Sequence, residues 1–63
     1  MAAQSETTAL QRLGIAKILL DACYATRGDL FRYASLKLEV DALYLPPEEH
    51  ASAVQELSYI LGV

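Results

Sequence analysis

The chain has 63 residues, of which 54% are hydrophobic, and a formal net charge of −3. The chain has a single cysteine, which excludes an internal disulfide. This cysteine and the single histidine are together too few ligands for a structural zinc site. The acidic balance disfavours nucleic acid as a partner, because proteins that bind nucleic acid usually carry a basic face.

A chain of this length forms one small helical domain over residues 1–63, and stability is hard to reach at this size. No apolar run approaches the roughly 20 residues that cross a bilayer, and the first residues lack the pattern of a signal peptide. We therefore expect a soluble, cytoplasmic protein with no cofactor, no metal and no membrane association. Tight helix packing, a partner subunit or both must then supply its stability.

The first predicted helix covers residues 5–27 and follows a disordered lead-in at residues 1–4. Ser5 can cap it, and residues with high helix propensity dominate the stretch that follows. The apolar residues form two neighbouring stripes at helical spacing: Leu13, Ala16, Leu20, Cys23 and Tyr24, and Ile15, Ile18, Leu19 and Ala22. Gly14 indicates either that another helix approaches closely at this position or that the first helix is locally less stable there, since glycine has a low helix propensity.

The tripeptide Arg27-Gly28-Asp29 predicts a turn. Gly28 can adopt the left-handed conformation that closes the first helix, and Asp29 can accept hydrogen bonds from the first N–H groups of the next. The same letters spell an adhesive motif, but without an export signal the turn is the better interpretation.

The second predicted helix, residues 29–45, is apolar on two nearly opposite sides. Its first stripe is Phe31, Ala34, Leu38, Ala42 and Leu45, and its second stripe is Tyr33, Leu36, Val40, Leu43 and Tyr44. Charged residues lie on the flanks between them, Arg32 with Glu39 on one side and Lys37 with Asp41 on the other. A helix that is apolar on opposite sides needs cover on both, so we expect it to lie between two neighbours.

Residues 36–42 also alternate between apolar and polar, which is typical of a half-exposed strand. The alternation ends at Leu43, and Leu, Lys, Glu and Ala all favour a helix, so we predict a helix here.

The third predicted helix covers residues 47–61. Pro46 pushes the residue before it out of helical geometry, and Pro47 suits the first position of a new helix. Glu48 and Glu49 then lie favourably at its positive end, and Gly62 can close it.

The expected fold is all-α, with three short helices in an up-down-up arrangement, a helical hairpin plus a third helix, that another subunit completes. We expect a protein partner or a second copy to cover the second stripe of the central helix, with Ile15, Leu19 or Ile60 adding area. Tyrosine is enriched at interfaces, and the spacing of Tyr33, Leu36, Val40 and Leu43 is that of a short coiled-coil seam. The alternative is that the other helices of the same chain cover this stripe.

Catalytic patterns are sparse. Cys23 and His50 form the one nucleophile–base combination, and the adjacent Glu48 and Glu49 point about 100° apart on a helix. We therefore expect a non-enzymatic protein–protein interaction module: a self-associating subunit, or an adaptor or co-chaperone that holds an amphipathic segment of a partner.

The alternative function is a nucleic-acid-binding regulator or antitoxin subunit that acts as a helical dimer. The segment 43–61 resembles the Leu-Pro-x-Glu-Glu helix starts of some small antitoxins. It covers less than a third of the chain and consists of general helix-capping chemistry, so it assigns no family.

Overall fold

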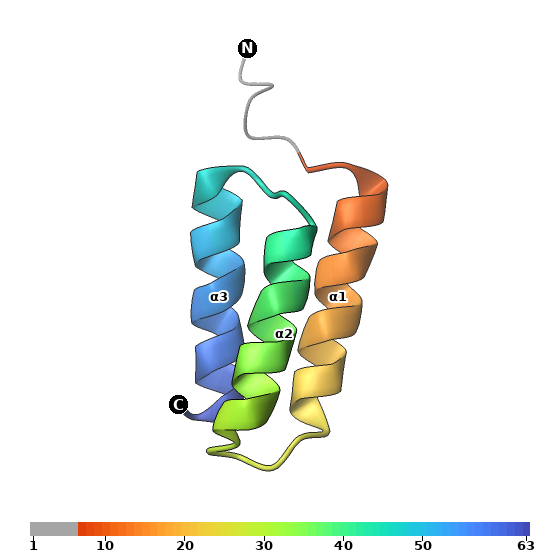
Figure 1. Ribbon diagram of the computed structural model, residues 1–63. Helices are drawn as coiled ribbons and strands as arrows, with labels where there is room; N and C mark the ends of the chain where they lie inside the picture. The colour runs from red at the N-terminus through yellow and green to blue at the C-terminus, as the bar shows by residue number, and fades with distance from the viewer. Residues whose placement is uncertain (1–6) are drawn as a thin grey trace.

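The computed structural model describes residues 7–63 and consists there of three helices packed side by side (Figure 1). The helices are α1 (Ala9–Cys23), α2 (Leu30–Ala42) and α3 (Pro47–Leu61). Short turns join them, so that α1 and α3 run in one direction and α2 in the other, and each helix contacts both of the others. The all-α class and the up-down-up order are therefore confirmed. No helix among the described residues is long and apolar enough to span a bilayer.

Helix α1 begins later and ends earlier than the predicted range of 5–27. Its N-cap is Thr8, whose Oγ1 accepts a hydrogen bond from the backbone N–H of Gln11 at 3.1 Å. The side chain of Gln11 accepts one from the backbone N–H of Thr8 at 2.9 Å in return, which completes a capping box. This reciprocal pair sets the start of the helix. Ser5 and the lead-in at residues 1–4 lie outside the described residues.

The turn between α1 and α2 confirms the left-handed conformation of Gly28 and the capping role of Asp29, but the prediction that Gly28 closes the first helix is wrong. Gly28 has a φ of 84°, but it lies in the turn after Cys23 and does not itself close α1. Its N–H donates to the carbonyl of Leu61 at 2.6 Å, which fastens the turn to the end of α3. Asp29 caps α2, because its Oδ1 accepts a hydrogen bond from the N–H of Arg32 at 3.0 Å.

Replacing Gly28 with valine should lower the melting temperature, because a β-branched side chain resists a positive φ. No atom lies within 4 Å of the added Cβ, so the cost comes from the backbone alone. We expect a loss of about 1–2 kcal/mol, or roughly 4–16 °C, in thermal unfolding followed by circular dichroism. Gly28→Asn is the control, since asparagine tolerates this conformation better. Equal melting temperatures for valine and glycine would contradict the account of this turn.

Helix α2 ends at Ala42, earlier than the predicted Leu45, and the reversal that follows uses a strained residue. Tyr44 has a φ of 54°, which is uncommon outside glycine. The amide of Gln11 donates to the carbonyl of Leu43 at 2.8 Å and so holds this end of α2 against α1. Helix α3 follows with the predicted bounds, Pro47–Leu61, and Gly62 closes it at a φ of 70°.

The core is one apolar cluster to which all three helices contribute. Its buried members are Ile18, Ala22, Leu36, Val40, Leu45, Ala53, Leu57 and Leu61. Of the two interpretations of Gly14, the structure shows the close approach, because a Cβ at this position would lie 2.7 Å from Cδ2 of Leu43. Glycine here lets the first turns of α1 pack closely against the end of α2.

Candidate interaction surface

The second stripe of α2 faces the chain's own core. Leu36 and Val40 have no exposed surface, and Tyr33 and Leu43 pack half-buried against the same cluster. Tyr44 is exposed. The expectation that a partner covers this stripe is therefore corrected at Leu36 and Val40, which α1 and α3 already enclose. The reason is geometric: both neighbours pack against one side of α2 instead of two opposite sides.

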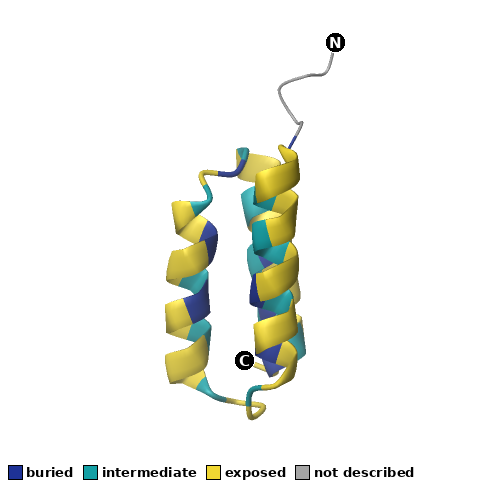
Figure 2. Ribbon diagram, turned by 90° about the vertical axis from the view of Figure 1, so that its right-hand side faces the viewer, coloured by how far each residue is buried: buried dark blue, intermediate teal, exposed yellow. Residues whose placement is uncertain are grey.

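The first stripe of α2 points away from the bundle. Phe31 is 89% exposed and Leu38 is 68% exposed. Ala34 and Ala42 are also exposed, and only Leu45, beyond the end of the helix, turns into the core. Figure 2 shows the buried positions of α2 directed at the other two helices and the exposed positions on the opposite side.

Helix α1 shows the same division. Its stripe of Ile15, Ile18, Leu19 and Ala22 packs into or against the core. Every member of its other stripe is exposed: Leu13, Ala16, Leu20, Cys23 and Tyr24. The chain thus presents exposed apolar side chains on two adjacent helices.

Four charged residues lie between these two exposed stripes. Nη1 of Arg32 on α2 lies 3.8 Å from Oδ2 of Asp21 on α1, and both side chains are about half exposed. Beside them, a shallow groove of about 280 Å³ is lined by Lys17, Leu20, Asp21, Tyr24 and Glu39. We call Lys17, Asp21, Arg32 and Glu39 the charge quartet. The outer face is the charge quartet together with its apolar neighbours: Leu20 on α1, Tyr24 directly after α1, and Phe31 and Leu38 on α2.

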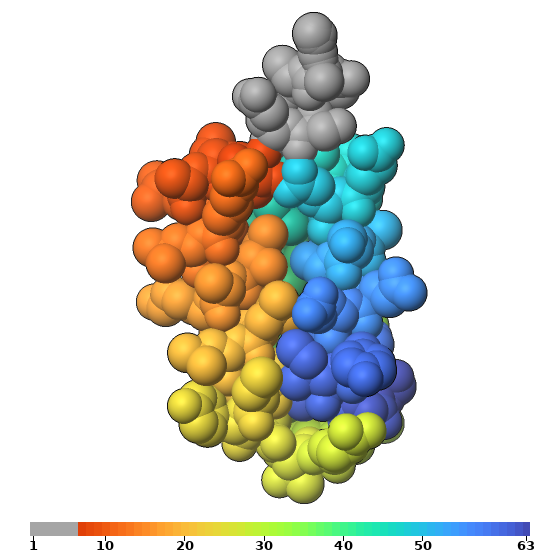
Figure 3. Space-filling view, turned by 180° about the vertical axis from the view of Figure 1, so that it is seen from behind, coloured from red at the N-terminus to blue at the C-terminus, as the bar shows by residue number. Residues whose placement is uncertain are grey.

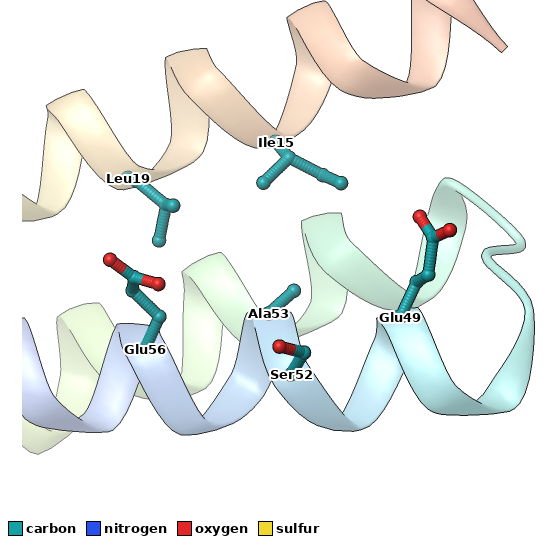
Figure 4. A pocket seen from close by; sticks show the side chains of 6 residues that line it. All are labelled: Ile15, Leu19, Glu49, Ser52, Ala53 and Glu56. Atoms are coloured by element: carbon teal, nitrogen blue, oxygen red, sulfur yellow. The ribbon is translucent and has the colours of Figure 1, made fainter. Parts of the chain in front are cut away.

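The opposite side of the molecule is formed by α1 and α3 (Figure 3). A second groove, of about 270 Å³, runs between them, with Ile15, Leu19 and Ala53 supplying its apolar part (Figure 4). Glu49 and Glu56 lie at its two ends, about 10.5 Å apart along the helix axis at 1.5 Å per residue. At that separation the two carboxyl groups do not share a proton as an acid–base couple does.

The Cys23–His50 pairing is not assembled. Cys23 is exposed at the end of α1, and His50 lies in the first turns of α3, at the other end of the bundle. Nε2 of His50 instead lies 2.5 Å from Oδ1 of Asp41 on α2. Across residues 7–63, no three potential ligands among His, Cys, Asp and Glu gather into a group that could hold a metal.

Because Asp41 contacts His50, we expect the free energy of unfolding of the chain to change with pH in the acid range. The hydrogen bond from His50 lowers the pKa of Asp41 below its ordinary 3.8, desolvation opposes this, and the charge of Lys37 adds to the lowering. A carboxyl group whose pKa is lowered by folding stabilises the chain above its unfolded pKa, and this contribution is lost as the pH falls through the folded value.

Replacing Asp41 with asparagine should therefore lower the midpoint of urea unfolding near neutral pH, and the effect should shrink as the pH falls through the folded pKa of Asp41, which lies below 3.8. Glu56→Gln, at an exposed carboxylate on α3, is the control. A difference between Asp41→Asn and the original chain that stays constant as the pH is lowered from neutral into the acid range would contradict this role.

The residues described here thus assemble neither a Cys23–His50 pairing nor a metal-binding cluster, and the most distinctive surface is the outer face of α1 and α2. Comparisons of the chain with protein-family models, curated proteins and solved structures find no significant match in any of the three.

Proposed function

We propose that this chain is a helical protein–protein interaction module that binds through the outer face. The observation that carries the proposal is the exposure of Phe31 and Leu38 on a helix whose other side already completes the core. The binding stripe is therefore the first stripe of α2, in place of the second stripe that the sequence pattern favoured.

The distribution of exposed apolar residues supports this location. Within residues 7–63, eight of the ten large hydrophobic residues that are exposed lie on α1, on α2 or in the turns that follow these helices: Leu10, Leu13, Leu20, Tyr24, Leu30, Phe31, Leu38 and Tyr44. The other two, Tyr59 and Val63, lie on or after α3. Scattered exposed hydrophobic residues are ordinary, but contiguous apolar surface usually marks an interaction site.

These exposed side chains also contribute little to folding. Phe31 and Leu38 bury little surface within the chain, so polar residues there would improve solubility at small cost in stability. An apolar stripe that does not serve the core is best explained by a surface that it buries elsewhere. Burial of such a helical stripe against another helix is a common mode of recognition.

Site-specific photo-crosslinking in cells tests the proposal. A benzophenone side chain replaces Leu38 on the outer face or, as the matched control, Glu48 on the exposed side of α3. We expect irradiation to produce a discrete crosslinked product from position 38 and none from position 48. The absence of a product at position 38, with the chain folded and present, would contradict the proposed function.

A further inference from the structure

We infer that the occupant of the outer face is a second copy of this chain, packed antiparallel so that α2 lies against α2 and α1 against α1. The inference rests on the proposed function and specifies its partner. It is carried by the signs and positions of the charge quartet.

The charge quartet places one positive and one negative residue on each of the two helices. Asp21 and Arg32 are paired across the helices. From this pair and in the same direction along the bundle, Glu39 is seven residues, or about 10.5 Å, from Arg32 along α2, and Lys17 is four residues, or about 6 Å, from Asp21 along α1. The signs therefore alternate both along each helix and between the helices.

This alternation makes the outer face complementary to itself. A twofold axis that lies in the interface, perpendicular to the helices and midway between Arg32 and Glu39, places Arg32 opposite Glu39 of the second copy. In a twofold interface this attractive contact occurs twice. Asp21 is then offset from Lys17 of the second copy by about 4.5 Å along the helix axis, a distance that the long lysine side chain can span.

The same rotation brings apolar side chains together. Phe31 precedes Arg32 and Leu38 precedes Glu39 in the chain, so Phe31 lies near Leu38 of the second copy when the charges meet. Small side chains at Ser35 and Ala42, on the α1 side of the stripe, allow the two helices to approach. Hydrophobic contact supplies affinity here, and the charges set the orientation.

The charge quartet is accessible and electrically neutral. Side chains of Arg32 and Asp21 are 48% and 54% exposed. A guanidinium has five N–H donors, so Arg32 can keep its contact with Asp21 and still reach a second carboxylate. The chain as a whole carries −3, but the two positive and two negative residues of the quartet cancel, so the contact region is not itself repulsive.

One side of the bundle is also large enough to form an interface of standard size. A standard interface buries about 800 Å² on each partner. The whole chain exposes 4473 Å², so the interface would occupy under a fifth of its surface.

Sedimentation equilibrium on charge-reversal variants tests the arrangement. Arg32→Glu should weaken dimerisation by about tenfold or more, because two attractive contacts become repulsive. Adding Glu39→Arg should restore most of the affinity, since opposite charges face each other again. Arg12→Glu, which makes the same charge change at an exposed site of α1 outside the outer face, should leave the dimer unchanged.

Thermal melting followed by circular dichroism establishes that each variant is folded. The same charge-reversal test is repeated on α1 with Lys17→Glu alone and with Lys17→Glu combined with Asp21→Lys. A chain that stays monomeric up to about 1 mM would overturn the inference. Equal effects of Arg32→Glu and Arg12→Glu, or no recovery in either double variant, would overturn it as well. A monomer that still crosslinks from position 38 to a different protein would leave the proposed function intact, whereas the absence of any crosslink there would remove both.

Discussion

Replacing Val40 with aspartate should unfold the chain, whereas the same replacement at Leu38, two residues away on α2, should leave it folded. Val40 is fully buried, and an unpaired carboxylate in an apolar core costs several kcal/mol or forces the group to take up a proton. A chain of this length has a total stability of only about 3–9 kcal/mol. Leu38 is mostly exposed, so its aspartate stays in water.

Far-ultraviolet circular dichroism with urea titration distinguishes the two variants. For Val40→Asp we expect a much reduced helical signal or no cooperative transition near neutral pH. For Leu38→Asp we expect the unfolding free energy to remain within about 0.5 kcal/mol of the original monomer, the usual range for surface substitutions. A stable Val40→Asp chain would mean that α2 is rotated so that a different stripe faces the core.

Truncating Leu57 to alanine should cost about 2–5 kcal/mol, because it leaves a cavity at a fully buried position of α3. Leu57 belongs to the cluster that joins α3 to the other helices, and the neighbouring side chains are fixed by their own packing. The loss is therefore a large fraction of the total stability.

The control for this truncation is Leu20→Ala, the same chemical change at a residue of α1 that is 56% exposed. We expect it to cost less than about 0.5 kcal/mol in the same urea titration, measured at a concentration low enough for the monomer to dominate. Equal losses for the two variants would show that Leu57 does not belong to the core as described.

Local backbone chemistry accounts for the parts of the fold that were predictable. The bounds of α3 follow from Pro46, Pro47 and Gly62, because proline and glycine restrict or release the backbone wherever they occur. Thr8 and Gln11 also have the spacing of a capping box, a local signal that marks the observed start of α1 later than the predicted cap at Ser5.

The end of α2 had no comparable local signal. Tyrosine rarely adopts a positive φ, so nothing in the residue type marks Tyr44 as the point of reversal. The side chain of Gln11, 32 residues before Leu43 in the chain, holds this end through its hydrogen bond to the Leu43 carbonyl. A contact between residues so distant in sequence is invisible to a reading of neighbouring positions.

Periodicity identified both stripes of α2 but could not say which one faces inward. Each stripe has helical spacing and comparable apolar content, so hydrophobicity alone does not separate them. The decision depends on where α1 and α3 pack, and both pack on the side of Leu36 and Val40. Tertiary packing therefore placed Leu36 and Val40 of the expected interaction stripe in the core and left the other stripe as the candidate interaction surface.

The exposed stripe of α2 is the surface through which we propose that the chain associates. The most direct test is the molar mass of the original chain and of Leu38→Asp, measured by sedimentation equilibrium at the same concentrations. The account predicts twice the 6.9 kDa chain mass for the original protein and a single chain mass for the folded variant. A monomeric mass for both proteins would contradict the dimer, and a dimeric mass for both would contradict the assignment of the exposed stripe of α2 as its interface.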